Sequence, residues 1–283
     1  MGMTDSCPVQ LSFRDDTAWL TLDGPRCNAI GRDMVAALGE AVETVRRRSA
    51  RALVITSANA SGFCQGDDLV EAHDRFATRD SRAHRVLRAV GLQHAPIQKM
   101  TDTLAVAAFL TRVNRALTRL ERLPCPSIAV VHGVCFGGGW ELAAACDLVV
   151  AERGARFGLP EVRLATLPAF GAVPRLERDL GPALLRDLLL TGRTLSARRL
   201  HDLGCVHQHV PKGRGEEVAA ALAERFCSLD AATLAHTKAF VKPTPRARLA
   251  EERARVLWLT RRTPFREALA SFALGGRRPH SYV

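Results

Sequence analysis

The sequence is poor in the features that mark membrane, secreted and metal-binding proteins. None of its apolar runs reaches the roughly 18 residues that a membrane-spanning helix needs, so we expect no membrane partner. Its first seven residues, Met-Gly-Met-Thr-Asp-Ser-Cys, lack the basic-then-apolar pattern of an export signal, which predicts a cytoplasmic location. The eight cysteines contain no Cys-x-x-Cys pair. We interpret them as reduced thiols, several of them buried, and not as disulfides or zinc ligands.

Metal ligands and nucleic-acid contacts are also scarce. His207 and His209 alternate within residues 205–210 and are expected to share one face of a strand, but two ligands without a third do not predict a metal site. The net charge is +11, which suits an anionic partner or serves solubility alone. Aromatic residues make up only 5% and do not alternate with basic ones, so we expect no nucleic-acid partner.

The densest chemical pattern lies in residues 126–147. An apolar run, Ile128–Val134, predicts a buried strand, three glycines follow at 137–139, and good helix formers continue from Glu141. At such a junction the first backbone N–H groups of the helix have no partner and lie at the positive end of its dipole. Glu141 falls in the first helical turn, where a carboxylate beside those N–H groups can act as an acid or base.

Other glycine-rich motifs do not fit this stretch. A dinucleotide fingerprint requires Gly-x-Gly-x-x-Gly, and Leu142 stands at the last glycine position. A phosphate-binding loop needs a lysine at the turn, and a nucleophile elbow needs a serine between the glycines; neither is present. From these residues alone, a simple strand-to-helix turn with a favourable charge at Glu141 remains an equal alternative to a catalytic site.

The stretch resembles the enoyl-CoA hydratase/isomerase (crotonase) family, in which a strand ends in Gly-Gly-Gly-x-Glu-Leu-Ala. The resemblance implies that Gly138 donates one N–H group of an oxyanion hole and that Glu141 is the first catalytic glutamate. Residues 61–69 resemble the family's Phe-x-Ala-Gly-Ala-Asp-Leu element, which makes Asp67 the second oxyanion donor. An acidic side chain there would oppose a developing oxyanion unless it turns away.

A third segment, residues 156–168, contains Phe-Gly-Leu-Pro-Glu and is similar to the family's Phe-Gly-x-Pro-Glu. The resemblance makes Glu161 the second catalytic carboxylate. The Pro-Gly-x-Gly-Gly that follows in many members is replaced here by Pro168-Ala-Phe-Gly-Ala172, and we expect Phe170 to reshape the acyl pocket. Residues 188–197 and 203–211 resemble the family's Thr-Gly-x-x-Ser-Ala and Gly-Leu-Val elements. The residues implied to contact the coenzyme are Arg26, Phe63, Cys64, Gln65, Gly66 and Phe272.

Hydrophobic patterns outside the motifs predict a layered α/β core. Residues 17–23 and 51–57 have the composition of strands, and a helix is expected from a cap at Asp33 to Arg46. The long segment 70–123 is interpreted either as an insertion over the acyl pocket or as an added surface helix. Its apolar stripe at helical spacing consists of Val106, Phe109, Leu110, Val113, Leu117 and Leu120.

The last 70 residues are predicted to be helical, over 216–229 and 230–241 and, after a break at Pro243–Pro245, to about Leu274. The resemblance implies a crotonase-like spiral of ββα units over residues 1–213. It assigns residues 214–283 to a helical oligomerisation region that forms trimers or dimers of trimers. The fold class is therefore predicted as α/β.

The predicted activity is that of an acyl-thioester lyase that adds water to, or removes it from, a 2-enoyl-CoA or a carrier-bound enoyl thioester. No separate cofactor is implied, because coenzyme A is part of the substrate. The sequence retains both family glutamates, Glu141 and Glu161. The resemblance therefore favours hydration over isomerisation, because isomerases of the family generally keep only one of them. An isomerase, a decarboxylase, a thioester hydrolase and a non-catalytic acyl-CoA-binding subunit remain alternatives, the last allowed by Asp67 and by Ala169 in place of glycine.

Overall fold

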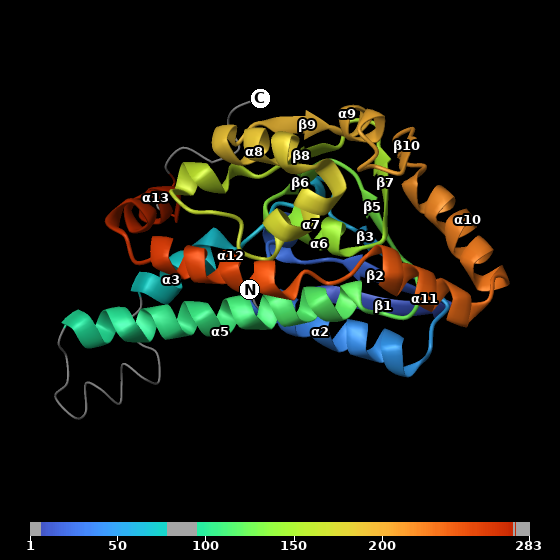
Figure 1. Cartoon of the computed structure of the whole chain (residues 1–283), viewed down its shortest axis with the longest axis horizontal. Helices are drawn as coiled ribbons and strands as arrows, with labels where there is room; N and C mark the ends of the chain where they lie inside the picture. Colours follow the sequence, from blue (N-terminus) through green and yellow to red (C-terminus); the bar gives the residue numbers. More distant parts are fainter. Residues whose placement is uncertain (1–6, 78–94, 274, 276–283) are drawn as a thin grey trace, which may run out of the picture.

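The protein, described by a computed structural model over residues 7–77, 95–273 and 275, is built around two β-sheets with helices on their outer faces (Figure 1). The larger sheet has six strands in the order β1-β2-β3-β5-β7-β10, parallel except for the β1–β2 hairpin. Its strands are β1 (Val9–Arg14), β2 (Thr17–Leu22), β3 (Ala52–Ser57), β5 (Ser127–Val131), β7 (Leu148–Glu152) and β10 (Gln208–Val210).

The smaller sheet has the order β4-β6-β8-β9 and is parallel except for the β8–β9 pair. Its strands are β4 (Gly62–Cys64), β6 (Val134–Phe136), β8 (Arg156–Gly158) and β9 (Thr194–Ser196). The chain places β3, β5 and β7 in the large sheet and the strand that follows each of them in the small one. This alternation is the predicted spiral of ββα units, and the α/β fold class is confirmed.

Burial explains why the large sheet forms where the sequence predicted strands. Every residue of β3 is buried, as expected for a strand covered on both faces. One face packs Trp19, Val54 and Ile128 against Ala219 and Ala223 of α10 (Gly215–Ser228). The other face joins the main core with the small sheet and the remaining helices.

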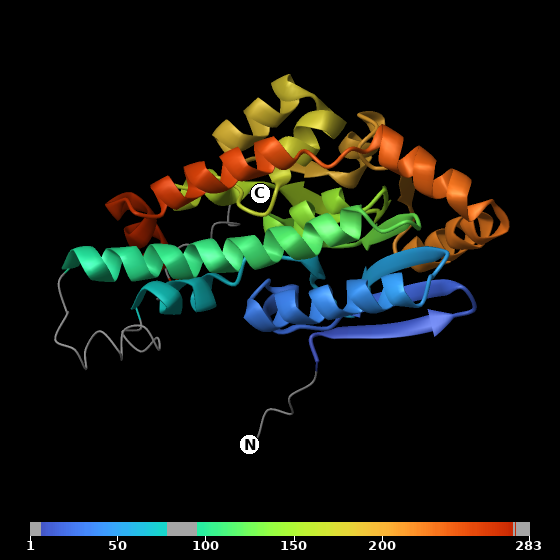
Figure 2. The same ribbon diagram turned by 60° about the horizontal axis from the view of Figure 1, so that its bottom comes forward.

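Three long helices run alongside the core: α2 (Arg32–Arg47), α5 (Ala95–Glu121) and α12 (Arg246–Leu259), with α5 in contact with both others (Figure 2). The predicted apolar stripe of α5, from Val106 to Leu120, is buried at all six positions. The other helices are α1 (Pro25–Asn28), α3 (Leu69–Ala77), α6 (Gly138–Ala145), the 3₁₀ helix η1 (Pro160–Leu164), α7 (Ala172–Leu180), α8 (Pro182–Thr191), α9 (Ala197–Asp202), α11 (Ala231–Val241) and α13 (Thr263–Ala273). The predicted helix end at Leu274 lies outside the described residues.

The prediction of one strand over Ile128–Val134 was wrong. Residues Ser127–Val131 belong to the large sheet and Val134–Phe136 to the small one, so the chain changes sheets at His132-Gly133. Gly133 has φ +53°, and a Cβ atom there would lie 2.3 Å from the carbonyl oxygen of Ser61. The close approach of the two backbones therefore requires glycine, which an apolar pattern alone does not reveal.

Two smaller predictions were also wrong. The N-cap of α2 is Gly31 and not Asp33, and the N–H group of Arg32 is bound by Glu71 from α3 at 2.9 Å. His207 lies before β10, and its Nδ1 accepts a hydrogen bond from the N–H group of Val149 at 3.0 Å, so it does not share a strand face with His209. In both cases the hydrogen-bond partner lies in a segment that is distant in the sequence, and a local pattern does not reveal it.

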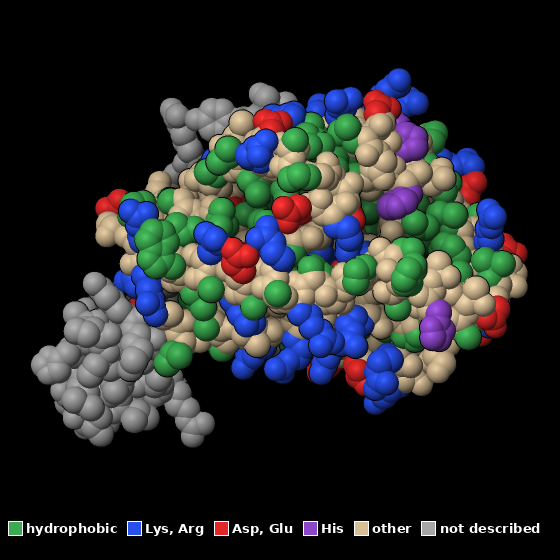
Figure 3. All heavy atoms as spheres, in the orientation of Figure 1, with side chains coloured by type: hydrophobic (Ala, Val, Ile, Leu, Met, Phe, Trp, Pro, Cys, Tyr) green, Lys and Arg blue, Asp and Glu red, His purple; other side chains and the backbone are tan. Residues whose placement is uncertain are grey.

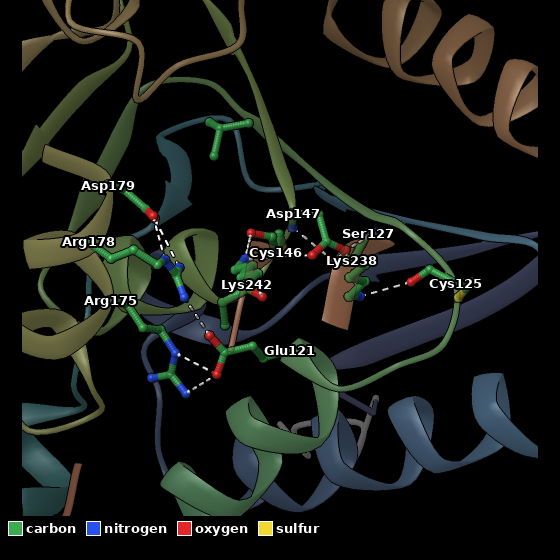
Figure 4. Close-up of polar contacts among 12 residues, drawn as sticks. Glu121, Cys125, Ser127, Cys146, Asp147, Arg175, Arg178, Asp179, Lys238 and Lys242 are labelled. Carbon is green, nitrogen blue, oxygen red and sulfur yellow. Dashed lines mark hydrogen bonds and ion pairs between the residues drawn. The ribbon is translucent and has the colours of Figure 1, made fainter. Parts of the chain in front are cut away.

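Helix α11 is attached to the core by two lysines (Figure 4). Lys238 Nζ lies 2.6 Å from a carboxylate oxygen of Asp147 and donates to the carbonyl of Cys125, and Lys242 Nζ donates to the carbonyls of Ala145 and Cys146 at the end of α6. A cation at the C-terminal end of a helix is favoured by the helix dipole. Helix α11 has no buried residue, so these hydrogen bonds and ion pairs connect it to the core in place of a buried apolar face. Within the described residues, no helix is long and apolar enough to span a membrane.

Candidate functional site

The strand–turn–helix unit predicted from the glycine motif is formed by β6, Gly137 and α6. Gly137 has φ +48°, and a Cβ atom on it would lie 2.6 Å from Oε1 of Glu161. Glycine at this position therefore lets the second predicted carboxylate approach the turn at the start of α6. Every residue of α6 is buried, including Glu141 in its first turn.

Gly138 and the segment before Asp67 lie next to one another. Gly138 is the first residue of α6, a position whose N–H group has no partner within a helix. A Cβ atom on Gly66 would lie 3.2 Å from the nitrogen of Gly138, and a parallel bridge to Ile30 fixes the backbone of Asp67. The two segments that the resemblance names as oxyanion donors are thus brought together.

A small cavity of about 80 Å³ lies beside this junction. Asp67, Glu141 and Glu161 are its ionisable lining residues, and the rest of the wall is mainly apolar. The cavity wall also includes residues from the C-terminal helices α12 and α13. Its remaining lining residues are Leu69, Ala72, Val106, Phe109, Leu110, Gly138, Leu164, Thr166, Leu167, Ala169, Phe170, Val256, Thr260, Phe265 and Leu269, the last four from α12 and α13.

One oxygen of the Glu141 carboxylate is bound by backbone N–H groups. Its Oε1 accepts hydrogen bonds from the N–H groups of Phe170 at 2.7 Å and Ala172 at 2.9 Å. Burial raises the pKa of Glu141 to about 7, although these two donors and the charge of Arg175 oppose the shift. The carboxyl can therefore change its protonation state near neutral pH, as a general base must.

Glu161 is a second buried carboxyl whose proton affinity is raised. Burial raises the pKa of Glu161 well above its ordinary value, and the neighbouring charge of Glu141 raises it further. Its Oε2 is buried and has no hydrogen-bond partner among the described residues. Two neighbouring buried carboxyls that both have raised pKa values, and whose charges oppose one another, favour a state in which one of them keeps a proton while the other is ionised.

Asp67 is one of the residues that line the cavity, and its charge raises the pKa of both Glu141 and Glu161. Three carboxyl groups thus share one small, mainly apolar space. Their mutual repulsion favours the presence of at least one proton in the site at neutral pH.

Phe170 closes the site over the predicted donor. A Cβ atom on Gly138 would lie 2.7 Å from Cε2 of Phe170, so the ring packs directly against this glycine. Phe109 of α5 supports the ring edge-to-face, with the centroids 6.0 Å apart. Phe170 therefore bounds the cavity, which is about half the ~150 Å³ that accommodates benzene in an engineered core.

Comparison with known proteins identifies the family. Residues 95–268 match the family model described as enoyl-CoA hydratase/isomerase. The chain belongs to this family. An enoyl-CoA isomerase/hydratase of Zymoseptoria tritici is 32% identical over 74% of the chain, and a mevalonyl-coenzyme A hydratase of Beauveria bassiana is 36% identical over 69%. These matches cover 65% and 63% of the relatives' own lengths.

Solved structures of family members show the same fold. An enoyl-CoA hydratase from Bacillus halodurans superposes with a TM-score of 0.77 at 20% identity, covering 93% of this chain and 99% of that one. OdaA from Pseudomonas aeruginosa superposes with a TM-score of 0.76 at 27% identity, covering 94% of this chain and 99% of that one. The crotonase fold predicted from the sequence is confirmed by these superpositions.

The residues that the family resemblance assigned to the coenzyme are largely engaged inside the protein. Arg26 pairs with Asp68 and is about half exposed. The side chains of Phe63 and Cys64 are buried, and the N–H groups of Phe63, Gln65 and Gly66 all donate to internal acceptors. Phe272 is half-buried on α13 and is not part of the cavity wall. Their coenzyme role stays a prediction.

Sequence reasoning missed Glu252, a carboxyl of α12 that is 4% exposed and lies close to the site. The run Arg-Leu-Ala-Glu-Glu-Arg looks like a solvated helix face. A signal was available, because Glu252 shares helical spacing with Leu249 and Val256, both buried, whereas its neighbour Glu251 pairs with exposed arginines. Among the described residues, no group of three or more potential ligands could hold a metal ion.

Proposed function

We propose that the protein catalyses the reversible addition of water to a 2-enoyl thioester of coenzyme A or of a carrier protein. The observation that carries this proposal is the pair Glu141 and Glu161, two buried carboxyls with raised pKa values that line one cavity beside Gly138. Such a pair can hold one water molecule between a base and an acid. The naming of matched relatives as hydratases supports the same chemistry.

In the forward direction, Glu141 takes a proton from water as the water oxygen bonds to the β-carbon of the enoyl group. The electron pair of the double bond moves toward the thioester, whose oxygen becomes enolate-like. The N–H groups of Gly138 and Asp67 would stabilise that oxygen, each such donor contributing roughly 100- to 1,000-fold in rate. Glu161 then gives its proton to the α-carbon, and the reverse sequence removes water.

The proposed roles have a pH signature. Glu141 must be ionised to accept a proton, and burial raises its pKa to about 7. We therefore expect kcat/KM, which reports the ionisation of the free enzyme, to fall as the pH drops below about 7, whereas an ordinary glutamate would remain ionised down to about pH 4. Glu161 must stay protonated, which its raised pKa allows at neutral pH.

The proposal is tested with crotonyl-CoA and longer 2-enoyl-CoA thioesters by following the loss of enone absorbance. Hydration predicts loss of absorbance and a 3-hydroxyacyl product. Double-bond migration, carbon dioxide release or free thiol would indicate an isomerase, a decarboxylase or a thioester hydrolase. Tight acyl-CoA binding by calorimetry without turnover of any thioester would favour a non-catalytic subunit.

The same experiment addresses the substrate's carrier. Two grooves flank α5, and its exposed arginines at 112, 115 and 119 line them, as does Arg122 just beyond the helix. Basic side chains gather along this edge of the molecule (Figure 3). A pantetheine thioester and a carrier-bound thioester belong in the assay. A faster reaction with the carrier-bound substrate than with either small thioester would identify the carrier as the natural partner.

The predicted trimer or dimer of trimers also remains a proposal. Large apolar side chains are exposed on the C-terminal helices, with Phe240 87% and Trp258 59% accessible. Light scattering that shows a monomer at micromolar concentration would contradict an oligomer. The cytoplasmic location stays a prediction, and several of the matched relatives are named as mitochondrial proteins.

Replacing Phe170 with alanine is expected to change the preferred chain length. The ring packs over Gly138 and fills space beside an 80 Å³ cavity, so its removal lets a longer acyl group enter. We expect kcat/KM to rise about tenfold or more for a 2-octenoyl thioester relative to crotonyl-CoA, since each buried methylene contributes about 0.8 kcal/mol. An unchanged ratio of kcat/KM values would show that Phe170 does not limit acyl length.

A further inference from the structure

The segment Ala169–Val173, a loop that runs into the first turn of α7 and is called the Ala169–Val173 loop below, supplies the hydrogen-bond donors of Glu141 and is bound by side chains from four helices. Asn114 Nδ2 of α5 donates to the carbonyl of Ala169 at 3.1 Å. Arg175 Nη1 of α7 donates to the carbonyl of Phe170 at 2.9 Å. Glu141 of α6 and Glu252 of α12 accept the loop's N–H groups. These hydrogen bonds restrict the movement of the loop relative to Glu141, the predicted base.

The N–H groups of this loop alternate between the two glutamates. Those of Phe170 and Ala172 donate to Glu141, whereas that of Val173 donates to Glu252 Oε2 at 2.9 Å. The N–H group of Gly171 also stabilises the charge of Glu252. The two carboxyls therefore bind alternate N–H groups of one short backbone segment, and Glu252 restricts how far that segment can move relative to Glu141.

Glu252 is a buried carboxyl, and burying a carboxyl costs stability that burying an apolar side chain would not. Its side chain is buried, and its Oε1 has no hydrogen-bond partner among the described residues. Burial and the charge of Glu141 raise the pKa of Glu252 to about 8. An apolar residue would fill this place on α12 without these costs, but it could not bind the N–H group of Val173.

We propose that Glu252 is a positioning residue for Glu141, acting through the Ala169–Val173 loop. By holding the N–H group of Val173, it keeps those of Phe170 and Ala172 directed at Glu141 Oε1. These donors favour the ionised form of Glu141, so their loss would make the base harder to ionise. The kinetic consequence rests on the proposed function, but the effect on the proton affinity of Glu141 does not.

The test is a ¹³C NMR titration of the Glu141 carboxyl in protein labelled with ¹³C-glutamate, its signal assigned from Glu141→Gln. Glu252→Ala and Glu252→Gln both remove the Glu252 charge, a charge that by itself raises the pKa of Glu141, but only the glutamine amide oxygen can still accept the Val173 N–H. We therefore expect the Glu141 midpoint of Glu252→Ala to lie about one pH unit above that of Glu252→Gln, as for the loss of one hydrogen bond to a charged group. With active enzyme, the acidic limb of the kcat/KM profile should differ between the two variants by the same amount.

Glu251→Ala is the matched control for a change on the same helix, because Glu251 is the adjacent residue of α12 and, among the described residues, pairs with the exposed Arg248 and Arg255, so its Glu141 midpoint should be that of the unaltered protein. Equal Glu141 midpoints in Glu252→Ala and Glu252→Gln would overturn the proposal. If Glu252→Ala does not fold, Glu252→Asp, whose carboxylate is one methylene shorter, must shift the midpoint upward, and no shift there overturns it equally. A shifted midpoint in a protein that turns over no thioester would reject the proposed function and leave the positioning role supported.

Discussion

Glu161→Gln is expected to lower kcat for 2-enoyl-CoA hydration by about 100- to 10,000-fold. Glutamine fits the same space beside Gly137 but has no proton to give to the α-carbon. Burial raises the pKa of Glu161 and so favours its neutral form, which glutamine resembles in charge and shape, and the substitution should leave the folded state intact. The loss should therefore appear in kcat, with an unchanged melting temperature.

Glu141→Gln is expected to cause a loss of similar size, because the amide cannot accept the proton of water. The double variant should lose little more than either single one, since the two carboxyls act as a unit. Glu251→Gln, an exposed change on α12, is the control and should keep full activity. Retention of more than a third of kcat in either Glu141→Gln or Glu161→Gln would contradict the proposed mechanism.

Arg175→Met is expected to reduce the free energy of unfolding by about 3–5 kcal/mol. Arg175 is fully buried, its Nη2 lies 3.2 Å from Oε2 of Glu121, and both side chains are inaccessible to solvent (Figure 4). Methionine would leave a buried carboxylate whose remaining contact is Arg178 Nη1 at 3.3 Å. The carbonyl of Phe170 would also lose its donor. Urea unfolding measures the change.

The matched control is Arg248→Met. Arg248 forms two ion pairs, with Glu177 and Glu251, but all three side chains are about half exposed, and such pairs contribute little to stability. Adding Glu121→Leu to Arg175→Met removes the stranded carboxylate and should recover part of the loss. Equal destabilisation by Arg175→Met and Arg248→Met would contradict the role assigned to the buried pair.

The sequence predicted the parts of the site that depend on short-range geometry. Three glycines before Glu141 require a tight turn into a helix, and the apolar stripe of α5 requires a buried face. The crotonase fold was predicted through the family motifs, and the same motifs named Glu141 and Glu161, which the structure places in the wall of one cavity. These predictions worked because each motif includes the residues that fix its own local structure.

The remaining features depend on contacts between distant segments. Nothing near Glu252 in the sequence indicates that Val173 would be its partner, and nothing near Asn114 points to the carbonyl of Ala169. The change of sheet at Gly133 likewise depends on its contact with Ser61. Such positions are decided by the packing of whole elements, which a local pattern does not specify.

The cavity's dependence on α12 and α13 has a consequence for how the protein is made. A ribosome adds α12 and α13 after every strand of both sheets has been synthesised. The roughly 60 residues from the last strand to the cavity-lining part of α13 take about 3–12 s to synthesise at about 5–20 residues per second. Until these helices dock, the part of the cavity wall formed by Val256, Phe265 and Leu269 is missing, so the nascent chain cannot enclose the space beside Glu141 and Glu161.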